Sequence, residues 1–129
     1  MNLLLDTQSF LYWTNQPEKL TAPALNAICS AGNRVSLSLV TAWEMQIKYG
    51  IKKLRLNKLP RELFESELID GTFTFLPITL DHVEALSRLP DIHRDPFDRL
   101  LIAQAIHEDL TLITGDNEIA EYPVRVLWN

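Results

Sequence analysis

Four carboxylate residues are spaced along the chain where a folded protein would bring acidic side chains together: Asp6, Glu44, Asp98 and Asp116. Asp6 and Asp116 each follow a short, mainly apolar run, whereas Glu44 and Asp98 fall in segments with helical spacing. Hard divalent cations such as Mg²⁺ and Mn²⁺ prefer oxygen ligands. A site of this kind suits phosphodiester hydrolysis, in which one or two metal ions activate water and stabilise the leaving oxygen.

The segments around these acids predict alternating strands and helices. Apolar and β-branched runs predict strands at residues 3–5, 34–37, 74–78, 111–114 and 124–128. Helical spacing with start and stop signals predicts helices at residues 7–13, 21–31, 38–49, 60–70, 79–86 and 95–108. A further short helix is expected to begin at Asp116. This alternation predicts an α/β fold, a three-layer α/β/α sandwich with a mainly parallel central sheet of about five strands.

The predicted fold gives the acids a common location. In sheets of parallel strands the ligand crevice lies outside the carboxyl ends of the strands. Asp6 and Asp116 both fall at such ends, so we expect them to face one crevice, with Glu44 on a neighbouring helix. Because clustered acids repel one another, such a group is costly unless a cation holds it.

Each acid also has a purely structural explanation. Asp6 and Asp116 are both suited to capping a helix that begins just after them. Thr41 and Glu44 have the spacing of a capping box. Asp98 lies in a first helical turn, where the helix dipole stabilises a carboxylate. These explanations do not account for strand-end acids that come with a matching acid on each of two helices.

Asp95 has the strongest structural explanation, because Pro96 follows it at the first position of a helix. We therefore expect Asp95 to be the helix cap and to reach a metal only through water. Arg94 and Arg99 flank this helix start. They either meet a phosphate or pair with Asp95 and neighbouring acids.

The net charge of −5 argues against a general nucleic-acid coat, although metal ions bound by clustered acids would restore positive potential locally. One stretch is basic and contains no acid: Lys48, Lys52, Lys53, Arg55, Lys58 and Arg61. It is either a phosphate-binding face or a solvated helix end, where cations are also favoured. The charge pattern alone leaves both open.

The remaining features are less informative. The length of 129 residues predicts one domain, and the lack of a basic leader and a long apolar core indicates a cytoplasmic protein. The single cysteine, Cys29, is expected to pack in a helix, and it excludes an internal disulfide. His93 lies in a loop beside Asp95, whereas His82 and His107 are expected at the surface. The tryptophans are expected in the core or an interface rather than as base-stacking platforms.

Taken together, the motifs resemble those of PIN domains over essentially the whole chain. The four PIN motifs resemble, in order, residues 3–7, 38–50, 93–105 and 112–116, which contain Asp6, Glu44, Asp98 and Asp116. Within the PIN family, the sequence is similar to VapC-type toxins of type II toxin–antitoxin systems.

The resemblance implies a Mg²⁺- or Mn²⁺-dependent endoribonuclease that acts as a toxin. Its catalytic residues would be the four acids, with Thr114 as a hydroxyl partner of Asp116. The resemblance also implies a homodimer and an antitoxin protein that covers the active site.

We expect Asp6, Asp98 and Asp116 to hold the metal, and Glu44 to complete the pocket or polarise a water. RNA phosphates would then meet Lys48, Lys52, Lys53 and Arg99. Two other functions stay open: a phosphatase that uses Asp6 as its nucleophile, and a PIN-like module that only binds a partner. The phosphatase type wants a second acid two residues after Asp6, where this chain has Gln8.

Overall fold

The computed structural model describes residues 1–129 and is built around a central sheet of five strands. The strands are β1 (Asn2–Leu5), β2 (Arg34–Ser38), β3 (Thr74–Leu76), β4 (Thr111–Ile113) and β5 (Val126–Leu127). Their order in the sheet is β3-β2-β1-β4-β5, and every neighbouring pair is parallel. The predicted parallel sheet is therefore confirmed, with β3 and β5 shorter than expected.

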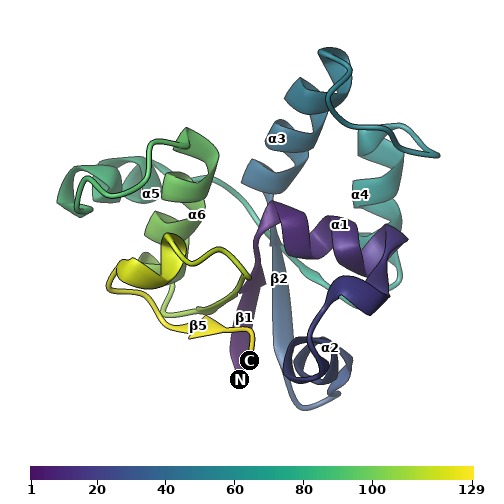
Figure 1. The fold of residues 1–129 in the computed structure, drawn as a ribbon, viewed down its shortest axis with the longest axis horizontal. Helices are drawn as coiled ribbons and strands as arrows, with labels where there is room; N and C mark the ends of the chain where they lie inside the picture. Colours follow the sequence, from purple (N-terminus) through teal and green to yellow (C-terminus); the bar gives the residue numbers. More distant parts are fainter.

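Helices cover both faces of this sheet. The α-helices are α1 (Thr7–Asn15), α2 (Ala22–Cys29), α3 (Leu39–Gly50), α4 (Pro60–Ile69), α5 (Leu80–Ala85) and α6 (Pro96–His107). Short 3₁₀ turns are η1 (Pro17–Lys19), η2 (Leu86–Arg88) and η3 (Ile119–Glu121). Figure 1 shows α5 and α6 on one side of β1 and β2, and α1, α2 and α4 on the other, which confirms the three layers. None of these helices has the length and apolar character needed to cross a membrane.

The first strand shows how the sequence builds the two cores. Leu3, Leu4 and Leu5 are fully buried. Because successive side chains of a strand point to opposite faces, Leu3 and Leu5 join one apolar cluster and Leu4 joins the other. Burial of each leucine contributes about 1.5–3 kcal/mol. A run of three leucines therefore places β1 at the centre of the sheet.

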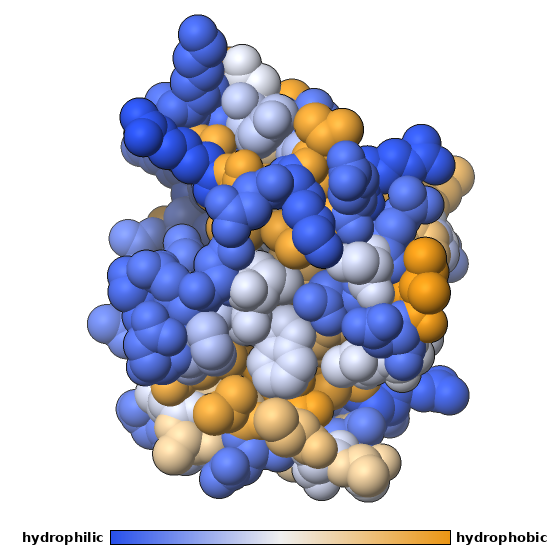
Figure 2. Space-filling view, turned by 90° about the vertical axis from the view of Figure 1, so that its right-hand side faces the viewer, coloured by the Kyte–Doolittle hydropathy of each residue, from blue (hydrophilic) through white to orange (hydrophobic).

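The layer formed by α1, α2 and α4 packs its largest apolar side chains on its inner side. Phe10 of α1 packs edge-to-face against Phe64 of α4 and against Phe73, with ring centroids 6.3 Å apart in both pairs. Figure 2 looks onto the outside of this layer, where hydrophilic residues cover most of the surface and apolar residues appear in separate patches. These helices are therefore held by one-sided burial against the sheet.

The strand order creates a switch point between β1 and β4. The chain runs outward from β1 to β2 and β3, and then returns to place β4 on the other side of β1. Ligands of open parallel sheets bind where the strand order reverses in this way. Asp6 directly follows β1, and Asp116 lies three residues beyond the end of β4.

Near this point the structure decides between Ser38 and Thr41, which the sequence left open as the cap of α3, and corrects the helix that was predicted to begin at Asp116. Ser38, and not Thr41, caps α3, because its hydroxyl accepts a hydrogen bond from the backbone N–H of Val40 (3.0 Å). Thr41 lies inside the helix, so Glu44 does not belong to a capping box. Asp116 does not begin a helix: its carboxylate accepts from the backbone N–H of Glu118 (2.9 Å) in a turn, and η3 starts at Ile119.

Two predictions about burial were also wrong. His82 is fully buried, and both of its ring nitrogens have partners there. One accepts from the backbone N–H of Thr79 (3.0 Å), and the other lies 2.8 Å from Glu108. A buried histidine with partners for both nitrogens does not lose its hydrogen bonds on desolvation. Cys29 is exposed at the last residue of α2 instead of packed. His107 is partly exposed at the end of α6, as expected.

Candidate metal centre

A cavity of about 650 Å³ opens at the switch point and is lined by sixteen residues. Its acidic members are the four acids predicted for the site together with the predicted supporting acid: Asp6, Glu44, Asp95, Asp98 and Asp116. They come from the ends of β1 and β4, from α3 and from the start of α6. The fold thus gathers carboxylates that are more than 100 residues apart in sequence, since Asp6 and Asp116 line the same cavity.

Asp6 both caps a helix and faces the cavity. One carboxylate oxygen accepts from the backbone N–H of Ser9 (2.8 Å), and only 5% of the residue is exposed. Burial raises the pKa of Asp6 and the charge of Glu44 raises it further, whereas hydrogen bonds from Ser9 and Thr114 oppose the rise. The buried hydroxyl of Thr114 also accepts from the backbone N–H of Asp116 (3.0 Å). Thr114 therefore links the two strand-end acids, in the supporting place predicted for it.

Glu44 carries an unusual buried charge. It is 4% exposed, and one of its carboxylate oxygens pairs with the ammonium group of Lys48, one turn along α3. Its other oxygen, Oε1, is buried without a hydrogen-bond partner. Such an orphaned polar atom costs about 1–3 kcal/mol, and more when it is charged. An orphaned carboxylate oxygen in an acidic cavity is what a missing cation would leave behind.

Lys48 is the charged partner of the buried Glu44 carboxylate. Partial burial disfavours its charged form, but the hydrogen bond and charge of Glu44, with the charges of Asp95 and Asp98, raise its pKa above the ordinary value. Its side chain lines the cavity together with Lys53. Lys48 was predicted to contact RNA; in this structure its positive charge neutralises the acids.

Asp98 is held in place by the start of α6. Asp95 caps this helix, as predicted, because one of its oxygens accepts from the backbone N–H groups of Phe97 (2.8 Å) and Asp98 (3.2 Å). Burial and the nearby charges of Asp95, Glu44 and Asp6 together raise the pKa of Asp98 to about 7, although His93 lowers it. Without a cation, the carboxyl group of Asp98 therefore keeps its proton to a higher pH than an ordinary aspartate does.

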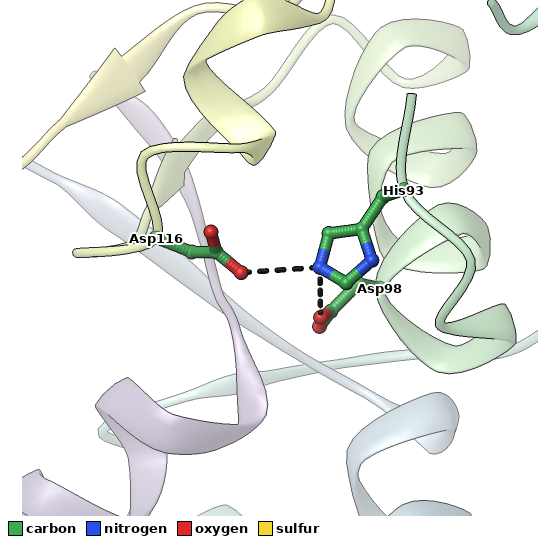
Figure 3. Close-up of side chains that lie close together, drawn as sticks. All are labelled: His93, Asp98 and Asp116. Atoms are coloured by element: carbon green, nitrogen blue, oxygen red, sulfur yellow. Dashed lines mark hydrogen bonds and ion pairs between the residues drawn. The ribbon is translucent and has the colours of Figure 1, made fainter. Parts of the chain in front are cut away.

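His93 bridges two of the acids, as Figure 3 shows. Its Nε2 atom lies 3.2 Å from one oxygen of Asp98, 3.2 Å from one oxygen of Asp116 and 3.7 Å from Glu118. Burial opposes its charged form, but the bond to Asp116 and the charges of Asp98, Asp116 and Glu118 raise its pKa. One atom each from His93, Asp98 and Asp116 lie within 4.8 Å of one another. The sequence marked His93 only as a loop neighbour of Asp95.

The loop that carries His93 is tied down by Tyr122 and Arg99. The backbone N–H of His93 donates to the hydroxyl of Tyr122 (2.6 Å), and Tyr122 is 3% exposed. The guanidinium of Arg99 donates to that hydroxyl (3.2 Å) and to the carbonyl of Pro90 (2.9 Å). Arg99 was predicted to contact RNA, but it does not line the cavity in this structure. Tyr122 has no signal in the sequence beyond its aromatic character.

The other predicted RNA contacts lie at the rim. Lys52 and Lys53 follow the end of α3, and both are exposed. Lys52 adopts a positive φ of 61°, and the backbone N–H of Lys53 donates to the carbonyl of Lys48 (2.8 Å). This turn brings Lys53, but not Lys52, to the cavity wall.

The chain end forms another part of the wall. Trp128 lines the cavity beside Gly115, and the hydroxyl of Thr21 donates to the carbonyl of Trp128. A Cβ atom added to Gly115 would lie 2.8 Å from the indole ring, closer than real side-chain contacts allow. Glycine is therefore required between Thr114 and Asp116.

The donor set fits a hard divalent cation. Carboxylate oxygens dominate the cavity, and such ions are bound by a few carboxylates together with water and substrate phosphates. Oε1 of Glu44 is buried without a partner, and burial raises the pKa values of Asp6 and Asp98, so ionised carboxylates are unfavourable in the protein alone. A bound cation would relieve both.

Solved structures with the same fold come from several bacteria. The chain is 18% identical to a protein in the VapBC2 complex from Rickettsia felis bound to a promoter DNA fragment, with a TM-score of 0.69 and coverage of 100% of both chains. It is 21% identical to a chain of FitAcB from Neisseria gonorrhoeae, with a TM-score of 0.62 and coverage of 98% and 96%. It is 20% identical to a chain of a toxin–antitoxin complex from Klebsiella pneumoniae, with a TM-score of 0.59 and coverage of 97% of this chain and 95% of that chain.

These likenesses establish the fold, because the identities are low. A comparison with curated protein sequences gives no match. The family comparison is more specific: residues 3–124 match the PIN domain, and this range includes every acid of the cavity. The chain therefore belongs to the PIN domain family.

Proposed function

We propose that this protein is a metal-dependent endoribonuclease and the toxin of a toxin–antitoxin pair, a VapC-type PIN domain. It would cleave RNA phosphodiester bonds with the help of Mg²⁺ or Mn²⁺. One observation carries the proposal: acids from four separate segments line a single cavity at the switch point of the sheet, and one of them, Glu44, has a buried oxygen without a partner. Membership of the PIN family favours a nuclease over the phosphatase alternative.

The residues of the cavity have distinct roles in this proposal. Asp6, Asp98 and Asp116 would hold the metal ion. When bound, the ion would supply activation of water and stabilisation of the leaving oxygen. Glu44 Oε1, which has no partner in the protein, would accept a hydrogen bond from a water molecule and orient it. Thr114 would keep the two strand-end acids at a fixed separation through its hydrogen bonds.

Substrate contact would rely on the rim of the cavity. Lys53 lines the wall and Lys52 is exposed beside it, so their ammonium groups can meet phosphates on either side of the cleaved bond. Such contacts give affinity without sequence preference. Lys48 would act inside the cavity, where it compensates Glu44. The intramolecular bonds of Arg99 make it a support for the His93 loop in this proposal.

An exposed apolar stripe on α3 supports a protein partner. Leu39, Trp43 and Ile47 are spaced by four residues and are 40%, 47% and 46% exposed, and Ile51 continues the stripe at 58%. Large apolar residues that gather on one helix face mark interaction sites. The similar structures are toxin–antitoxin complexes, so we propose an antitoxin protein that covers this face and the cavity, and a homodimer as the working unit.

An RNase assay with purified protein tests the nuclease proposal. Wild type and Asp6→Asn are compared on a single-stranded RNA in Mg²⁺ and in EDTA. Asparagine is chosen because it caps a helix about as well as aspartate does. Cleavage by wild type in Mg²⁺, but not in EDTA and not by Asp6→Asn, is expected.

Glu84→Gln is the matched control, because Glu84 is an exposed acid on α5 whose side chain does not line the cavity. It should cleave RNA as wild type does. Equal cleavage by wild type and Asp6→Asn, with both folded by circular dichroism, would disprove the assignment.

A further inference from the structure

The imidazole of His93 sits where two acids of the centre meet, and its role can be derived from its hydrogen bonds. We propose that His93 is a positioning residue: its Nε2–H group donates to Asp116, lies against Asp98 at the same distance and holds the two carboxylates for the metal, without being a metal ligand itself. This inference rests on the proposed function. It assigns a role to a residue outside the four acids.

The hydrogen on Nε2 follows from what surrounds the other ring nitrogen. Nδ1 of His93 accepts the backbone N–H of Asp95 at 3.1 Å. A proton on Nδ1 would set two N–H groups against each other. The neutral ring therefore carries its proton on Nε2, and the charged ring carries one there as well. Both forms present a donor to the acids.

The acceptor atoms show which carboxylate oxygens the histidine engages. Nε2 is hydrogen-bonded to the Oδ2 atom of Asp116 (3.2 Å) and lies equally close, at 3.2 Å, to the Oδ2 atom of Asp98. The second oxygen of Asp116 accepts from the backbone N–H of Glu118 (2.9 Å). The carboxylate of Asp116 is thus held at both oxygens, and that of Asp98 lies against the same ring nitrogen. Ligating carboxylates are commonly oriented by hydrogen bonds of this kind.

The ring is itself preorganised. The backbone N–H of His93 donates to the buried hydroxyl of Tyr122 (2.6 Å), which also accepts from Arg99 (3.2 Å). With the Asp95 N–H on Nδ1, these bonds restrict both the position of the residue and the rotation of its ring. A ring held in this way can impose a geometry on the acids, which come from different segments.

Direct ligation by nitrogen is the competing explanation, because His93 Nε2 and the acid oxygens lie close enough to share an ion. Ligation through Nε2 needs a lone pair on that atom and hence the proton on Nδ1. This arrangement would break the bond from Asp95 and leave two donors facing each other. The hydrogen bonds therefore favour the donor role.

Metal titration of the full chain separates the two roles. Isothermal calorimetry with Mg²⁺ and, separately, with Co²⁺ is run on wild type, His93→Ala and His93→Gln, whose amide N–H can replace Nε2–H. If His93 is a donor, His93→Ala lowers the affinity for both metal ions by a similar factor, about 10-fold to 100-fold. His93→Gln recovers most of that loss. His107→Ala is the control, because His107 is partly exposed and does not line the cavity.

A nitrogen ligand would give a different pattern. An imidazole ligand favours Co²⁺ over Mg²⁺. His93→Ala would then lower the affinity for Co²⁺ far more than that for Mg²⁺, and His93→Gln would not restore it. That pattern would overturn the inference, and so would unchanged affinities in His93→Ala. RNA cleavage by the same variants is measured as well, so that a failure of this inference can be told from a failure of the proposed function. If wild type binds metal and cleaves RNA while His93→Ala matches it, the inference fails and the proposed function stands.

A second measurement does not depend on metal. The chain has three histidines, so ¹⁵N resonances of His93 in the metal-free protein can be assigned with His93→Gln. At a pH at which the ring is neutral, the pattern of a proton on Nε2 and none on Nδ1 is expected. A ring protonated only at Nδ1 would contradict the donor role even if metal binding and RNA cleavage are both observed.

Discussion

Apart from Asp95, which caps α6, the acids of the cavity fall into two halves that differ in burial and in how their charge is compensated. The inner half consists of Asp6 and Glu44, which are 5% and 4% exposed. The outer half consists of Asp98 and Asp116, whose side chains are 18% and 36% exposed. Lys48 pairs with the inner half, whereas His93 bridges the outer half.

The difference follows from the elements that carry the two halves. Asp6 directly follows β1, and Glu44 lies on α3, which starts where β2 ends, so regular backbone structure fixes both. Asp116 lies in a turn after β4, and Asp98 is bridged by a histidine from the loop before α6. The inner half is therefore held by strand and helix geometry, whereas the outer half joins a residue of the first turn of α6 to a residue of a turn through the side chain of His93.

The largest expected effect tests whether both halves serve one reaction. Asp6→Asn and Asp98→Asn should each lower kcat/KM for RNA cleavage about 100-fold to 1000-fold, the scale of losing one preorganised electrostatic group. The double variant should be little worse than either single variant, because residues that act as a unit are not additive. Steady-state kinetics on one RNA substrate gives all three values. Full activity of Asp6→Asn would contradict a reaction shared by both halves and, with it, the proposed assignment.

The next effect concerns stability and metal. Mg²⁺ at 100 times its Kd should stabilise the protein by about 2.7 kcal/mol, which for a domain of this size raises Tm by about 10 °C. Asp6→Asn and Asp98→Asn should both lose most of this rise in a thermal shift assay, and Glu84→Gln should keep it. A rise that survives Asp6→Asn but not Asp98→Asn would place the ion in the outer half alone.

A smaller effect concerns pH in the absence of metal. Asp98 has a pKa of about 7 in the folded protein against an ordinary value of 3.8, so the folded state binds its proton more tightly. Its contribution to stability is therefore present below about pH 4 and is lost as the pH rises toward 7. The raised pKa values of Asp6 and His93 act in the same direction.

The measurement is Tm in EDTA between pH 5 and pH 8 for wild type and Asp98→Asn. Relative to the variant, wild type should lose stability as the pH rises. Saturating Mg²⁺ should remove this loss, because a cation favours the ionised acid. Parallel curves for the two proteins would show that Asp98 keeps an ordinary pKa and that the outer half is well solvated.

The smallest effect distinguishes the two cavity lysines. In an Asp6→Asn background, Lys53→Ala should reduce the salt dependence of RNA binding by about 0.7 in log–log slope, the value for one contact to a single strand. Lys48→Ala should change the slope less, because its charge is paired with Glu44. Binding isotherms at several salt concentrations give both slopes. Equal reductions would show that Lys48 also reaches the RNA.

The order of strands and helices was predictable because each element carries its own signal. The leucines of β1, the Asp95-Pro96 start of α6 and the Pro60 start of α4 are local patterns, and the structure confirms all three. Alternatives stayed open where two patterns competed. Thr41 and Glu44 have capping-box spacing, but the hydroxyl of Ser38 already caps α3, so Glu44 is left to face the cavity.

The site was predictable only in part. The four acids could be named because strand ends and helix starts place them near one edge of a parallel sheet, and they do line one cavity. His93, Tyr122 and the role of Arg99 could not be found in this way. Their contacts join residues 23 to 29 positions apart through loops that have no regular period.

The sequence by itself determined the element order, the central β1, the helix caps and the set of acids, because these depend on short-range periodicity and residue chemistry. Only the tertiary structure decided which charges compensate them. Lys48 and Glu44 lie one turn apart on α3, but only the fold buries the carboxylate of this pair, and His93 reaches from the loop before α6 to Asp98 and Asp116. Burial changes the energy of a charge far more than its sequence neighbours do, and burial exists only once the chain has folded.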